Sequence, residues 1–145
     1  MNPRQPLVHA NVVQLSIAYQ HLSAKLNQDL RPLGLNMTQL SILTRFSRFE
    51  GLRETISSLA AAMQMNQPAT TKAVQALVSN GWLARTPDEK DARITHITIT
   101  PAGLQQLGAA HQACGPTVDA AYANHSVEEL QTFLQLQTKL ADAVT

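Results

Sequence analysis

Apolar residues recur at steps of three and four along most of this chain, which is the spacing of one face of an α-helix. The first series lies between residues 8 and 30 and predicts a long helix that ends before Pro32. Its members are Val8, Val12, Leu15, Tyr19, Leu22, Leu26 and Leu30. Asn36 and Gln39 then form a capping-box pattern, which predicts a second helix. The core face of this helix consists of Leu40, Leu43 and Phe46.

The same spacing predicts two helices in the last third of the chain. Thr100 and Pro101 open the first, and Gly115-Pro116 is expected to kink or interrupt it. Its apolar stripe consists of Leu104, Leu107, His111, Cys114 and Val118. Ser126 and Glu129 form a capping box for the last helix, whose apolar positions are Val127, Leu130, Phe133, Leu134 and Leu140.

Between these outer helices, residues 55–81 have the pattern of two short helices joined by a three-residue turn. The hydroxyl of Thr55 can cap the first helix, and its apolar face consists of Ile56, Leu59, Ala60 and Met63. The turn is residues 64–66, with Met65 expected to point into the core. Asn66 caps the second helix, Pro68 is tolerated in its first turn, and Gly81 ends it.

A period of two replaces the helical period after residue 81. Residues 82–85 are predicted to form one strand and residues 94–100 its partner, in which Ile97 and Ile99 share one side. The intervening segment TPDEKDAR is charged and turn-forming. Helix, turn, helix and β-hairpin in this order predict a winged helix-turn-helix, which places its second helix in a DNA major groove.

The outer face of the second short helix has side chains that suit DNA. Gln67 and Gln75 can make bidentate pairs with adenine, Thr71 can contact a base edge, and Lys72 can neutralise a phosphate. A plain solvated helix face has the same polar composition. The hairpin favours DNA binding because Arg85, Lys90 and Arg93 can meet phosphates or the minor groove. Asp91 is expected to pair with Arg93 and fix the loop.

These segments resemble the winged-helix core of the multiple antibiotic resistance regulator (MarR) family of bacterial transcription factors. The resemblance is carried by Leu59-Ala60, the helix from Pro68 to Leu77, Asn80-Gly81-Trp82-Leu83, Arg85, Asp91-Ala92-Arg93 and residues 97–103. The family has a small hydroxyl or basic residue after the wing arginine, where this chain has Ile94. The predicted DNA-binding residues are Asn66, Gln67, Pro68, Thr71, Lys72, Gln75, Arg85, Lys90, Asp91 and Arg93.

Composition agrees with a single globular domain of 145 residues, with 44% hydrophobic and 14% charged residues. The expected fold is mainly α with a small β-hairpin wing, in which residues 36–100 form the DNA-binding lobe. Residues 45–93 contain seven basic and five acidic side chains, a modest basic excess. The net charge of the whole chain is only +1, which excludes a polybasic protein that coats DNA. The single Cys114 excludes an internal disulfide and favours the cytoplasm. No stretch suggests a membrane span.

Residues 7–34 and 101–145 carry more apolar surface than a small winged helix can cover, which predicts a homodimer through these terminal helices. The resemblance implies a repressor on pseudo-palindromic double-stranded DNA, released by a small aromatic or phenolic effector. We expect no cofactor, because the histidines and one cysteine lack metal-ligand spacing, and no catalytic constellation, so the protein is not predicted to be an enzyme. Two alternatives remain open, a redox-sensing regulator through Cys114 and a winged-helix interaction module that does not bind DNA.

Overall fold

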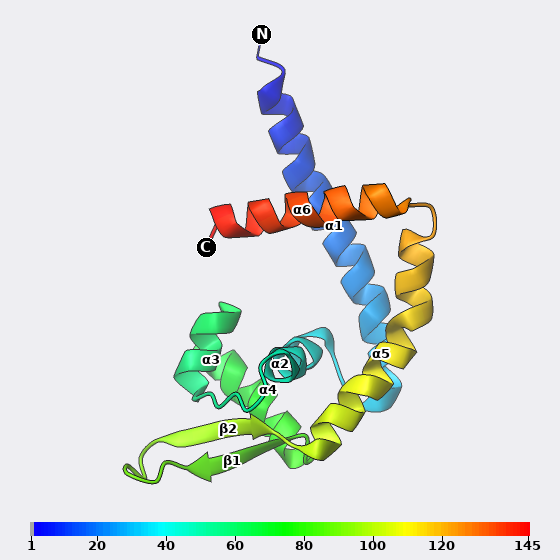
Figure 1. The fold of residues 1–145 in the computed structure, drawn as a ribbon. Coiled ribbons are helices and arrows are strands. Elements are labelled where there is room, and N and C mark those ends of the chain that lie inside the picture. The colour runs from blue at the N-terminus through cyan, green and yellow to red at the C-terminus, as the bar shows by residue number, and fades with distance from the viewer. Residues whose placement is uncertain (1) are drawn as a thin grey trace. The chain divides into compact units, whose positions relative to one another are not determined.

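The computed structural model describes residues 2–145, which form six α-helices, one short 3-10 helix and a two-stranded antiparallel sheet (Figure 1). The elements are α1 (Arg4–Leu30), η1 (Arg31–Leu33), α2 (Met37–Arg48), α3 (Ile56–Met63), α4 (Gln67–Ser79), β1 (Leu83–Pro87), β2 (Thr95–Ile99), α5 (Pro101–Tyr122) and α6 (Val127–Ala143). The chain divides into two compact units, before and after the bond between Cys114 and Gly115. The predicted mainly helical fold with a hairpin wing is confirmed.

Side-chain caps define where the short helices begin. Asn36 and Gln39 form the predicted capping box of α2, and Ser126 and Glu129 form that of α6. Thr55 caps α3 by accepting a hydrogen bond from the backbone N–H of Ser58. These caps satisfy amide groups that have no partner within the helix, so the local sequence predicts each of these helix starts correctly.

The core of the first unit lies where α2, α3 and α4 meet the end of α1, the base of the hairpin and the first part of α5. Its fully buried large side chains are Leu30, Ile42, Leu43, Phe46, Leu59, Val74, Leu77, Leu83 and Ile97. They come from α1, α2, α3, α4, β1 and β2, and α5 adds Leu107, Ala110 and Cys114 to the same cluster. The hairpin and the helix-turn-helix are thus parts of one packed body. In Figure 1 the green helices α3 and α4 lie next to the hairpin.

The buried face of α5 differs from the predicted stripe. Gly103, Leu107, Ala110 and Cys114 are buried, whereas Leu104 and His111 of the predicted apolar stripe are exposed within the single chain. The buried face is displaced by about one position because small residues allow α5 to approach the hairpin closely. A Cβ atom at Gly103 would overlap the carbonyl oxygen of Trp82.

Helix α5 also continues through Pro116, so of the two predicted outcomes, a kink or an interruption, the interruption does not occur. The two compact units divide at the neighbouring bond, before Gly115.

Glu54 joins the base of the hairpin to two helices. Its backbone pairs with Ile97 of β2 through N–H···O bonds of 3.0 and 2.7 Å, which adds one residue of a third strand. Its buried carboxylate accepts hydrogen bonds from Arg45 of α2, at 2.8 and 3.1 Å, and from the hydroxyl of Ser58 in α3. The carboxylate is therefore paired despite its burial, as a buried charge requires.

Two helices keep large apolar side chains in solvent. In α1 these are Leu7, Val8, Val12, Val13, Leu15, Ile17 and Tyr19, with only Leu26 and Leu30 buried. In α6 they are Val127, Leu130, Phe133, Leu134, Leu136 and Leu140, and no residue of this helix is buried. This many exposed large apolar side chains on two helices is typical of an interaction surface.

Candidate nucleic-acid interface

Helices α3 and α4 meet at the predicted three-residue turn. Gln64 has a φ of 51°, in the left-handed region, and this turns the chain sharply after α3. The N–H of Met65 then bonds the carbonyl of Ala60 at 2.9 Å. Met63 and Met65 are both partly buried, and of the two it is Met63 that packs against the core. The prediction that Met65 fills the core is therefore wrong, because the left-handed residue ends the helix one position before it.

Helix α4 is buried on one face and open on the other. Thr70, Val74 and Leu77 are completely buried. On the opposite face, Pro68, Lys72 and Gln75 are exposed and Thr71 is partly buried. These side chains share the outer side of α4, as predicted. An exposed row of amide, hydroxyl and ammonium groups on a second helix can form hydrogen bonds with base edges and phosphates.

The first turn of α4 fixes two of the predicted side chains. Asn66 accepts a hydrogen bond from the N–H of Ala69 at 2.8 Å, so its amide oxygen caps the helix. Gln67 is exposed, and its Nε2 donates to the hydroxyl of Ser57 in α3 at 3.2 Å. The sequence could not have indicated the contact of Ser57 with Gln67, because the two residues lie in different helices and meet only in the folded structure. The Gln67 amide retains a second N–H and its carbonyl oxygen for another partner.

The hairpin presents the predicted cations at its surface. Strands β1 and β2 pair from Leu83 with Ile99 to Pro87 with Thr95. Arg85 in β1 and Lys90 in the loop are both exposed. In Figure 1 the loop between the strands extends beyond the helices of its own unit. The wing therefore has the exposed basic tip that a groove or phosphate contact requires.

Asp91 and Arg93 form the predicted ion pair at this tip. The Arg93 guanidinium donates to both carboxylate oxygens of Asp91 at 3.0 Å, and the Arg93 N–H adds a third bond. This contact lowers the pKa of Asp91 and raises that of Arg93. The Arg93 side chain nevertheless remains 90% exposed. Asp91 thus orients the arginine and leaves its outer edge open.

Asp88 is a wing residue that sequence analysis missed. Its carboxylate accepts hydrogen bonds from the N–H groups of Lys90 and Asp91 and lies 2.7 Å from Nε2 of His96. The bond to His96, followed by the two backbone bonds, lowers the pKa of Asp88. An Asp after Pro87 is a turn signal, which could have indicated the backbone bonds. The contact with His96 in β2 has no such local signal in the sequence.

Cys114, the candidate redox residue, is buried in the core of the first unit. Burial and, secondarily, the negative charge of Asp29 raise the pKa of its thiol. The thiolate is the reactive form of cysteine, so this environment disfavours oxidation and supports packing as the role of Cys114.

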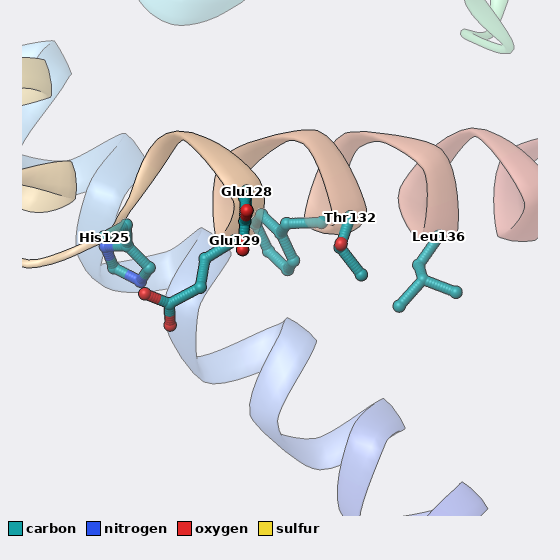
Figure 2. A pocket seen from close by; sticks show the side chains of 6 residues that line it. His125, Glu128, Glu129, Thr132 and Leu136 are labelled. Carbon is teal, nitrogen blue, oxygen red and sulfur yellow. The ribbon is translucent and has the colours of Figure 1, made fainter.

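The part of the chain that the structure describes contains no cluster of three metal-ligating side chains. Within the same residues, no helix is long and apolar enough to cross a membrane. A shallow pocket lies along the start of α6, lined by His125, Glu128, Glu129, Thr132, Phe133 and Leu136 (Figure 2). Its two carboxylates disfavour an anionic ligand by charge repulsion.

Sequence comparisons point to one family. The model of the MarR family matches residues 35–95, which include α2, α3, α4, β1 and the wing loop. The chain is also similar to the transcriptional regulator AdcR of Streptococcus pyogenes serotype M6, with 36% identity over 92 residues. This match covers 62% of the chain and 58% of AdcR, so the chain matches little more than half of that relative's length.

Solved structures show the same fold over nearly the whole chain. BldR from Sulfolobus solfataricus, a transcriptional regulator, has a TM-score of 0.77 and 27% identity, over 96% of this chain and 99% of BldR. A mutant MarR from E. coli complexed with operator DNA has a TM-score of 0.76 and 22% identity, over 97% of this chain and 99% of MarR.

Proposed function

Because the chain belongs to the MarR family through its winged-helix segment, we propose that it is a sequence-specific DNA-binding regulator of transcription. Two findings on similar proteins support this function. AdcR and BldR are transcriptional regulators, and MarR of the same fold has been crystallised with operator DNA.

One observation carries the proposal, namely that the outer face of α4 and the wing tip are both open and polar. Gln67, Lys72 and Gln75 are exposed on α4, and Arg93 is 90% exposed on an ordered tip. In a winged helix these two surfaces belong to one rigid unit, so α4 can enter a major groove while the wing contacts the flanking backbone. Asn66, Pro68, Thr71, Arg85, Lys90 and Asp91 complete the proposed site.

We further propose that the protein is a homodimer through its terminal helices. The exposed apolar side chains of α1 and α6 support this, because burying each large apolar side chain contributes about 1.5–3 kcal/mol. Two-fold symmetry of the dimer would match a pseudo-palindromic operator with its half-sites about one turn apart, roughly 34 Å. Residues 7–34 and 101–145 then serve as dimerisation helices, and residues 36–100 as the DNA-binding lobe.

We propose repression as the regulatory effect, with release by a small aromatic or phenolic effector. Support for the effector comes from the family resemblance alone. The pocket along α6 does not add to it, since Glu128 and Glu129 oppose an aromatic acid (Figure 2). The raised pKa of the buried Cys114 disfavours a cysteine switch as the signal.

Gel-shift binding to duplexes from the chain's own promoter region tests the proposed function. We expect a complex that resists unlabelled competitor of unrelated sequence and weakens steeply with salt, since phosphate contacts release counterions. Lys72→Ala should weaken binding to every sequence. Binding that is absent, or equal for promoter and unrelated duplexes, would instead favour an interaction module that does not read DNA.

A further inference from the structure

The wing tip is held by a chain of side-chain contacts that begins in β2. His96 of β2 lies 2.7 Å from Oδ1 of Asp88, and Oδ2 of Asp88 accepts the N–H groups of Lys90 and Asp91, both at 3.0 Å. The backbone N–H of Asp88 also bonds the carbonyl of Ile94 at 2.8 Å. Asp88 therefore connects the strand with both sides of the turn.

The exposed arginine depends on this turn. Arg93 is held by Asp91, through bonds from its guanidinium and its backbone N–H. Asp91 is in turn held by Asp88, through its own N–H. A loop that is already ordered loses less conformational entropy when it binds. Without the Asp88 contacts the loop would be less ordered before binding. Lys90 and Arg93 would then both lose more conformational entropy on contact with DNA.

From this geometry we infer that Asp88 is a positioning residue of the wing, which acts with His96 to hold Lys90 and Arg93 ready for DNA. The inference rests on the proposed function, and it adds an acidic residue to the side chains that raise the affinity for DNA. Charge alone predicts the opposite effect, because a carboxylate near DNA is repelled by phosphates. Removal of Asp88 should therefore weaken DNA binding if Asp88 positions the wing, and strengthen it if only charge repulsion matters.

The test compares Asp88→Ala with Glu89→Ala in the full-length protein. Glu89 is an exposed acid in the same loop, so its replacement removes the same charge as a matched control. The probe is a duplex of about 30 base pairs enriched from a random pool by the wild-type protein, long enough for two half-sites one turn apart. We expect Asp88→Ala to weaken binding roughly fivefold or more, the lower range of a lost wing contact. Glu89→Ala should bind as tightly as wild type or tighter.

Two further variants test whether the effect of Asp88 on DNA affinity depends on its hydrogen bonds and on Arg93. Asp88→Asn keeps a side-chain oxygen that can accept the backbone N–H groups and should restore binding to within about twofold of wild type. In an Arg93→Ala background, Asp88→Ala should weaken binding by a smaller factor than in the wild-type background, because the Arg93 contact is already gone and only that of Lys90 remains to be lost. A role of Asp88 in global stability alone would instead give no rescue by Asn and additive losses.

Amide hydrogen exchange at Lys90 and Asp91 measures the ordering step without DNA. Exchange at both amides should become faster in Asp88→Ala and stay slow in Asp88→Asn. The inference is overturned if Asp88→Ala leaves exchange unchanged, binds as tightly as Glu89→Ala, is not rescued by Asn, or adds fully to Arg93→Ala. Failure of the wild-type protein to bind any duplex would overturn the proposed function instead, while the exchange measurement still decides whether Asp88 orders the wing.

Discussion

Replacing Gly103 by alanine should destabilise the protein, although alanine normally favours a helix over glycine by about 1 kcal/mol. Gly103 lies in the first turn of α5, where an added Cβ would overlap the carbonyl oxygen of Trp82 and lie 2.9 Å from Cγ1 of Ile99. The Trp82 carbonyl cannot move freely, because it already accepts the N–H of Thr100 at 3.1 Å.

The magnitude follows from two opposing effects. Forcing a methyl group into a packed site costs about 1–3 kcal/mol and sometimes more. Contact with backbone on one side and a packed Ile99 on the other places this substitution at the upper end of that range. After the gain in helix propensity, we expect a net loss of about 2 kcal/mol. For a chain of this size the melting temperature should fall by roughly 4–8 °C.

Thermal melts and urea titrations at one fixed protein concentration measure this effect, because stability of an oligomer depends on concentration. Gly108→Ala is the matched control, since it lies in the same helix and an added Cβ there meets nothing within 4 Å. This variant should be stabilised by up to about 1 kcal/mol. A Gly103→Ala protein that melts at or above the wild-type temperature would refute the close approach of α5 to the hairpin.

Three other predictions concern the proposed function. Arg93→Ala should weaken DNA binding by about 1–3 kcal/mol with the oligomeric state unchanged, and unchanged affinity at moderate salt would contradict the assigned wing contact. Gln75→Ala should reduce the preference for matched over mismatched duplexes, whereas Lys72→Ala should weaken both alike; an equal loss on both duplexes from Gln75→Ala would show that it reads no base. Replacing Phe133 and Leu134 together by Asp should give monomeric or unfolded chain that binds no operator, and sedimentation of wild type as a monomer at micromolar concentration would exclude the dimer.

Local signals in the sequence were sufficient for the helix starts and for the order of the elements. Asn66 shows why, because the donor that it caps is only three residues away and the pattern is independent of the rest of the fold. The pairing of Asp91 with Arg93 was predictable for the same reason, as the two residues lie close together in a short loop. Such features depend on a few neighbouring residues.

Contacts between elements could not be predicted in this way. Glu54 and Arg45 are nine residues apart and meet only after α2, α3 and β2 have packed together. The apolar stripe that the sequence shows in α5 includes Leu104, which is exposed within the single chain. The structure instead buries Gly103, whose lack of a side chain is what permits the contact.

The pairing of Glu54 with Ile97 limits where the length of the wing can vary during evolution. One residue inserted between Ile94 and Ile97 would reverse the facing of every later side chain in the strand, because neighbours in a strand point to opposite sides. Ile97 would then leave the core, and Glu54 would lose its backbone partner. We therefore expect insertions and deletions to be accommodated in the loop between the strands, so that the reach of the wing can change while the base of the hairpin keeps its length.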